Sequence, residues 1–116
     1  MLGTDRTLRK KSEFGYVFRV GKKKVGQFMV VYAVRNGLEQ NRYGIVTSKK
    51  VGNAVRRNQA RRRLREFIRK TDRGLKSGFD VVVIARTGIN SASYQMLVEE
   101  GQQLLKRLGL LRCQEC

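Results

Sequence analysis

The sequence predicts an α+β fold, a two-layer α–β sandwich of order roughly αβββαβα, and three observations support this prediction. The chain has 116 residues, which is the size of a single domain. Runs of β-branched and aromatic residues predict strands at 28–34, 43–48 and 79–85. Apolar residues at helical spacing lie before, between and after these strands. We therefore expect one domain over residues 1–116, with about 8–108 ordered.

The stretch KKSEFGYVFRVG predicts the first helix. Ser12 is a suitable N-cap, and Phe14, Val17 and Phe18 fall at i, i+3 and i+4. Gly21 suits the position after the last helical residue, where a left-handed backbone is common.

The strands follow from local composition. Asn36-Gly37 is a turn signal between the strands at 28–34 and 43–48. The run FDVVVIA at 79–85 is continuously apolar, which favours a strand covered on both faces. The pattern leaves open whether a short edge strand precedes Phe28.

Residues 54–70 predict an amphipathic, Arg-rich helix. At 100° per residue, its apolar side chains form a stripe about 100° wide; these are Ala60, Leu64, Phe67 and Ile68. The opposite side carries Asn58, Arg62 and Arg69, flanked by other basic residues. Glu66 is the only acid in this segment, so ion pairs within the helix cannot neutralise the basic face.

The last helix is predicted to begin near Ser91 or Ser93. Its apolar positions recur at helical spacing: Tyr94, Leu97, Val98, Leu104, Leu105 and Leu108. Gly109 is a suitable stop.

A formal charge of +17 indicates a polyanionic partner, either nucleic acid or an anionic membrane surface. In residues 54–70 Arg far outnumbers Lys, and Arg suits bidentate contacts with phosphate. A helix lying on a membrane needs a broad apolar face, whereas this narrow stripe is needed for the core. The apolar runs are also too short to span a bilayer, so we expect a nucleic-acid-binding, cytoplasmic protein without a membrane partner.

The aromatic residues have two interpretations. Phe14 and Phe18 lie one helical turn apart, and Tyr32 lies on a predicted strand. They can pack in the core, or they can stack on unpaired bases of single-stranded RNA. The pattern does not separate these alternatives.

The residues argue against a self-sufficient enzyme or metal site. The chain has no His, and Glu99 and Glu100 are its only adjacent acids, which on a helix point apart. Cys113 and Cys116 form C-x-x-C, which can be half of a metal site or a redox pair, but no second pair completes a tetrahedral site. We therefore expect reduced thiols there, no catalytic residue and no protein-bound cofactor or metal.

The stretch RYGIVTSKKVGNAVRRNQARRRLREFIR resembles the protein subunit of bacterial ribonuclease P. The family motif is Ala-x-x-Arg-Asn followed by basic residues, here Ala54, Arg57, Asn58 and then Arg61, Arg62 and Arg65. The resemblance extends from about Leu8 to Leu108. Gln59 and Ala60 depart from the residues that are common in the family.

The resemblance implies a left-handed βαβ crossover that carries the Arg-rich helix, and a role in binding two RNAs. The protein would bind the catalytic RNA and the single-stranded 5′ leader of precursor tRNA, while the RNA, with Mg²⁺, cleaves the leader. The family's leader-binding positions match Phe14, Phe18, Tyr32, Val46, Arg57, Asn58, Arg61 and Arg65. Its catalytic-RNA-binding positions match Lys49, Lys50, Arg57, Asn58, Arg61, Arg62, Arg65 and Arg69. The free protein is expected to be a monomer.

Two other functions share part of this pattern. A structural binder of ribosomal RNA would have the same charge but no need for a leader cleft. A protein-only endonuclease would cleave precursor tRNA without a catalytic RNA.

Overall fold

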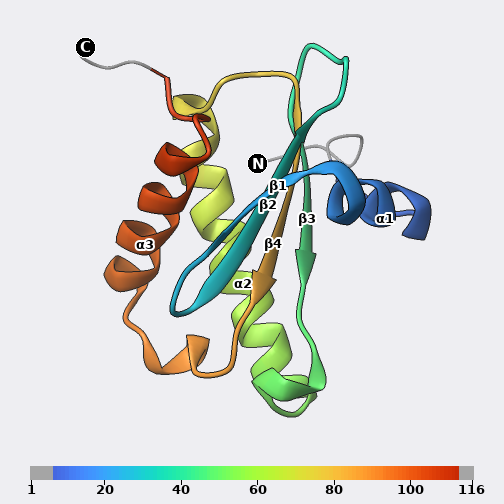
Figure 1. The fold of residues 1–116 in the computed structure, drawn as a ribbon. Coiled ribbons are helices and arrows are strands. Elements are labelled where there is room, and N and C mark those ends of the chain that lie inside the picture. Colours follow the sequence, from blue (N-terminus) through green and yellow to red (C-terminus); the bar gives the residue numbers. More distant parts are fainter. Residues whose placement is uncertain (1–6, 113–116) are drawn as a thin grey trace.

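The computed structural model describes residues 7–112 and has the predicted order αβββαβα (Figure 1). Its main elements are α1 (Lys11–Val20), β1 (Lys22–Val25), β2 (Met29–Arg35), β3 (Arg42–Val46), α2 (Ala54–Thr71), β4 (Phe79–Ala85) and α3 (Tyr94–Arg107). The three strands and three helices predicted from the sequence are present, with ends that shift by one or two residues. The additional strand, β1, resolves the question of the edge strand before Phe28.

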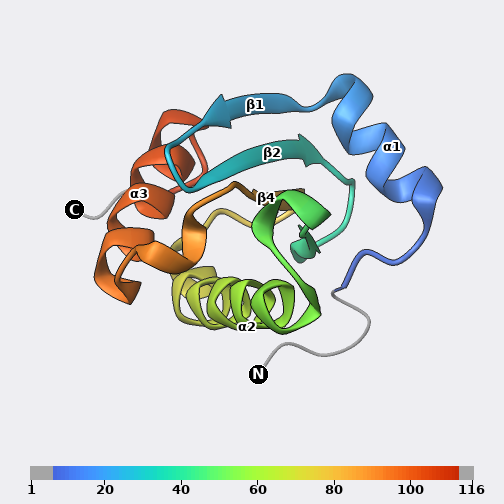
Figure 2. The same ribbon diagram turned by 90° about the horizontal axis from the view of Figure 1, so that it is seen from below.

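The four strands form one sheet in the order β1-β2-β4-β3. β2 runs antiparallel to β1 and β4, and β3 runs parallel to β4, with Val46 opposite Ile84. In Figure 1 β3 and β4 both point downward, β4 lies to the left of β3, and α2 passes behind them; Figure 2 confirms this layering. The β3–α2–β4 crossover is therefore left-handed, against the usual right-handed rule.

The main core lies between the sheet and a helical layer formed by α2 and α3. Alternate residues of β2, such as Met29 and Val31, point into it and meet Leu64 and Phe67 of α2. The other sheet face is partly covered by α1, where Val17 packs on Val82. β4 is buried on both faces, as its continuous apolar run predicted.

The predicted stripe of α2 is confirmed, because Ala60, Leu64, Phe67 and Ile68 are all buried. Helix α3 approaches α2 closely at Gly101. A Cβ on Gly101 would lie 2.2 Å from the ring of Phe67, so a larger residue there would push the helices apart.

The helix ends match the predictions only in part. Ser93 caps α3 by accepting a hydrogen bond from the Met96 N–H at 3.1 Å, and Gly109 has the left-handed φ of +79°. The prediction that Ser12 caps α1 is wrong, because the helix begins at Lys11 and Ser12 lies inside it.

The predicted left-handed conformation at Gly21 is also wrong, since its φ is −74°. The glycine is instead required by space: a Cβ there would lie 2.4 Å from the carbonyl oxygen of Val17. Cys113 and Cys116 fall outside the described residues. None of the helices within residues 7–112 has the length and hydropathy needed to cross a bilayer.

Candidate nucleic-acid interface

The outer face of α2 presents exposed arginines at four positions; they are Arg56, Arg62, Arg65 and Arg69. Across residues 7–112, neither Arg62 nor Arg65 has a carboxylate partner. Their positive charges are therefore available to phosphates. The pattern of α2 predicted this outward orientation for Arg62 and Arg69.

Glu66 neutralises one end of this face. Its carboxylate accepts a hydrogen bond from Arg69 Nε at 3.1 Å and lies 3.6 Å from Lys70 Nζ. The Arg69 hydrogen bond lowers the pKa of Glu66, and Glu66 in turn raises the pKa of Arg69. Of the predicted catalytic-RNA contacts, Arg69 is thus already engaged within the protein.

Three further arginines of α2 are half-buried and bound to the protein. Arg57 donates to the Gly52 carbonyl at 3.0 Å, at the entry to the helix. Arg63 donates to the carbonyls of Ile89 and Ala92 and so fastens α2 to the loop before α3. Helical periodicity did not distinguish Arg63 from Arg62, because this loop is distant in sequence.

Arg61 connects α2 to the end of β3. It donates to the Thr47 hydroxyl at 2.8 Å and to Asn58 Oδ1 at 3.2 Å. Thr47 follows Val46, the last residue of the edge strand β3, so this contact joins α2 to the edge of the sheet beside Val46, whose side chain packs on the other face.

The segment between β3 and α2 adds exposed cations. Lys49 and Lys50 lie in a short 3₁₀ turn, in which Ser48 Oγ accepts a hydrogen bond from the Lys50 N–H at 3.2 Å. Asn53 then caps α2 through the Arg56 N–H at 3.0 Å. Both lysines therefore lie beside the basic end of the helix at which the free N–H groups point outward.

An aromatic cluster, formed by Phe14, Phe18 and Tyr32, lies on the sheet face that α1 covers. The ring centres of Phe14 and Phe18 are 6.4 Å apart, and those of Phe18 and Tyr32 are 5.0 Å apart in an edge-to-face arrangement. Phe14 and Tyr32 are half-buried, whereas Phe18 is 40% exposed. Val46 packs partly buried in the same cluster of side chains.

The geometry fits both interpretations of the aromatic residues: one ring packs in the core, and another is exposed and could stack on a base. Phe14 packs on the sheet at Gly44, where a Cβ would lie 2.5 Å from its ring. Phe18 leaves a ring surface open to a ligand. Lys23 Nζ lies 5.8 Å from the centre of the Tyr32 ring and adds a cation that the sequence pattern did not indicate.

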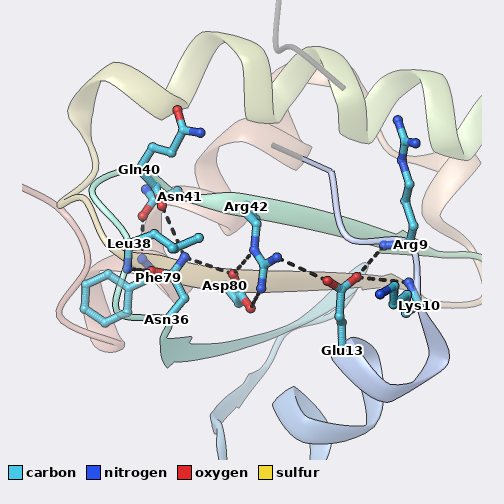
Figure 3. Close-up of polar contacts among 10 residues, drawn as sticks. All are labelled: Arg9, Lys10, Glu13, Asn36, Leu38, Gln40, Asn41, Arg42, Phe79 and Asp80. Carbon is cyan, nitrogen blue, oxygen red and sulfur yellow. Dashed lines mark hydrogen bonds and ion pairs between the residues drawn. The ribbon is translucent and has the colours of Figure 1, made fainter. Parts of the chain in front are cut away.

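A partly buried ion network fixes the position of α1 against the sheet (Figure 3). Arg42 Nη2 lies 2.8 Å from Asp80, and Arg42 Nη1 lies 3.1 Å from Glu13 at the start of α1. The hydrogen bonds to Asp80 raise the pKa of Arg42. Backbone N–H groups of Arg9 and Lys10, and then the charge of Arg42, hold the pKa of Glu13 below its ordinary value of 4.5. These partners are distant in sequence, and no local pattern indicated them.

The structure therefore brings Phe14, Phe18, Tyr32 and Val46 together and links them to α2 through Arg61 and Thr47. Arg57, Asn58 and Arg65 lie on α2 itself, outside the aromatic cluster. Within the described part of the chain, no three His, Cys, Asp or Glu side chains gather as a metal site would require.

A comparison with protein families finds a match over residues 2–109 to the family described as Ribonuclease P. The ribonuclease P protein component of Syntrophomonas wolfei is 36% identical over 110 residues, which cover 95% of this chain and 92% of the relative.

Two solved structures have the same fold. The Staphylococcus aureus RNase P protein has a TM-score of 0.83 at 27% identity, covering 92% of this chain and 98% of its own. The Thermotoga maritima RNase P protein has a TM-score of 0.79 at 36% identity, covering 86% of this chain and 97% of its own. The chain belongs to the ribonuclease P protein family.

Proposed function

We propose that the protein binds the catalytic RNA of ribonuclease P and the 5′ leader of precursor tRNA, and so assists the endonucleolytic removal of the leader. Family membership supports its place as a subunit of this endoribonuclease. The outer face of α2 would bind the catalytic RNA, and the aromatic cluster with Val46 would bind the leader.

The observation that carries the proposal is that Arg62 and Arg65 have no carboxylate partner within residues 7–112 and project from an ordered helix whose other side is buried. A rigid helix presents guanidinium groups at fixed spacing, so little conformational entropy is lost when they contact phosphates. Phe18 adds an exposed ring of the kind that stacks on unpaired bases. Together the two surfaces fit a folded RNA and a single-stranded RNA.

The protein's own contribution in this proposal is binding and positioning. Holding the leader on the aromatic cluster while α2 holds the catalytic RNA would place the cleavage site without a catalytic side chain. Mg²⁺ is expected in the holoenzyme, where the RNA supplies the chemistry.

The test is 5′ cleavage of precursor tRNA by the catalytic RNA at low Mg²⁺, with and without this protein. We expect strong stimulation by the protein and no cleavage by the protein alone. The absence of stimulation would favour a structural binder of ribosomal RNA, and cleavage without the catalytic RNA would establish a protein-only nuclease. Sedimentation of the RNA-free protein would test the expected monomer.

A further inference from the structure

A pocket of about 440 Å³ lies at the end of the sheet where β1 begins and β2 ends. Three cations from different parts of the chain line it: Lys22 of β1, Arg35 of β2, and Lys76 in the loop before β4. All three are exposed, and none of the described residues that line the pocket is acidic. The pocket is therefore suited to an anion.

The remaining lining is apolar and aromatic. Val20 and Leu108 lie on its walls, and Phe79 lies beneath Arg35, whose Cζ is 5.2 Å from the ring centre. This contact holds the guanidinium at the pocket in place of a freely moving side chain. A ligand that fits has both phosphate charge and a planar apolar part, which describes a nucleotide unit.

The pocket lies next to the aromatic cluster at the end of the sheet, and residues of both sheet faces line it. Val20 lies two residues after Phe18 on α1, and Val34 lies two residues after Tyr32 on β2; both line the pocket. Because residues i and i+2 of a strand share a face, Val34 is on the same side of the sheet as Tyr32, about 7 Å further along. Lys22, Ala33 and Arg35 line the pocket from the opposite face, so a strand of RNA lying on Phe18 and Tyr32 would pass around this end of the sheet to reach them.

β1 provides cations on both faces of this edge of the sheet. Lys23 lies over Tyr32, and Lys22, on the opposite face of the strand, lines the pocket. Arg35 shares the face of Lys22, since Lys22 pairs with Ala33, and Lys76 lies in the loop before β4. Positively charged side chains therefore lie both at the aromatic cluster and at the pocket.

We propose that this pocket is a second leader subsite, in which Lys22, Arg35 and Lys76 bind a nucleotide of the 5′ leader lying beyond the aromatic cluster. This inference rests on the proposed leader binding and adds the direction in which the leader runs, from Phe18 toward Val20. The protein would then distinguish precursor tRNAs by leader length as well as by the presence of a leader.

The experiment measures binding of precursor tRNAs, with leaders shortened one nucleotide at a time, to the holoenzyme reconstituted with its catalytic RNA. The variants are Lys22→Ala and Lys76→Ala. The matched control is Lys24→Ala, which removes the same charge from an exposed β1 residue that does not line the pocket.

We expect Lys22→Ala and Lys76→Ala to weaken binding only for leaders long enough to reach the pocket. For those leaders, each variant should reduce the slope of log affinity against log salt concentration by about 0.7. Lys24→Ala should change neither. Losses that do not depend on leader length, losses matched by Lys24→Ala, no loss at all, or weaker binding of the catalytic RNA alone would each overturn the subsite.

Phe18→Ala, measured in parallel, separates this inference from the function on which it rests. If Phe18→Ala weakens leader binding while the pocket variants have no effect, the second subsite is wrong and the aromatic cleft stands. If Phe18→Ala leaves leader binding unchanged, the leader cleft itself is wrong.

Discussion

Arg61 of α2 donates a hydrogen bond to the hydroxyl of Thr47 at 2.8 Å, and so fastens the basic helix to the strand that carries Val46. The two proposed RNA surfaces lie on opposite faces of the sheet, and this contact joins α2 to the edge strand β3 that contributes Val46 to the other surface. A guanidinium held here has a fixed position relative to both surfaces.

Thr47→Val should keep the shape of the side chain and remove this hydrogen bond. Since a side-chain hydrogen bond contributes about 0.5–1.5 kcal/mol, the free energy of unfolding should fall by no more than that. Leader-bearing precursor tRNA should bind more weakly because Arg61 loses its fixed position, while binding of the catalytic RNA changes less. A filter-binding comparison of the two RNAs measures this; equal effects on both would contradict a bridging role.

Phe18→Ala should weaken binding of leader-bearing precursor tRNA and leave mature tRNA unaffected. Loss of one base-stacking ring costs about 1–3 kcal/mol of binding free energy. Tyr16→Ala is the matched control, because Tyr16 is an equally exposed aromatic residue of α1 that contacts Arg19 and is not part of the aromatic cluster. Equal losses for leader-bearing and mature tRNA, or for the two variants, would refute the cleft.

Arg62→Ala should lower affinity for the catalytic RNA and reduce the slope of log affinity against log salt by about 1. Arg63→Ala is the matched comparison on the same helix, because Arg63 is bound to the carbonyls of Ile89 and Ala92. We expect Arg63→Ala to lower the free energy of unfolding and to leave the salt slope close to that of the unmodified protein. An unchanged slope for Arg62→Ala would contradict a phosphate contact there.

The contrast between Arg62 and Arg63 shows how far sequence reasoning reaches in this protein. Periodicity within one helix identified the buried stripe of α2 and hence its outer face, because both depend on neighbours three and four residues away. It could not show that Arg63 meets a loop 26 residues later, since that contact depends on the tertiary fold.

The same limit applies to the strands and to the proposed sites. Composition located β2, β3 and β4, but not the charged edge strand β1. Its KKKV sequence lacks strand propensity, and the strand forms by pairing with β2. The resemblance to the family indicated the proposed RNA-binding residues. The positions of Lys23 and Thr47, and the pocket at Arg35 and Phe79, could be recognised only in the folded structure.

Glu100→Gln should destabilise the β1–β2 turn. The Glu100 carboxylate accepts hydrogen bonds from three consecutive backbone N–H groups, those of Gln27 and Phe28 at 2.7 Å and that of Met29 at 3.1 Å. An amide in its place turns an N–H₂ group toward these donors, so we expect a loss of about 1–3 kcal/mol in the free energy of unfolding. Denaturant unfolding measures this, with Glu99→Gln on the exposed side of α3 as the control; equal effects would contradict a specific role for Glu100.

Glu13→Gln should reduce the loss in the free energy of unfolding that occurs as the pH falls into the acid range. The folded-state pKa of Glu13 is held below its ordinary value of 4.5, first by the backbone N–H groups of Arg9 and Lys10 and then by Arg42. A carboxyl group with a lowered pKa contributes its stabilisation in full above the unfolded-state pKa and loses it as the pH falls through the folded-state pKa.

Unfolding measured from pH 7 down through pH values below 4.5 should therefore show a smaller pH-dependent loss in Glu13→Gln than in the unmodified protein. Glu39→Gln, at an exposed loop position, is the control. Because Glu13 positions α1, and α1 carries Phe14 and Phe18, the same variant should also weaken leader binding at neutral pH. Parallel acid limbs in Glu13→Gln and the unmodified protein would show that the contacts of Glu13 with Arg42 and the first turn do not contribute to the stability of the fold.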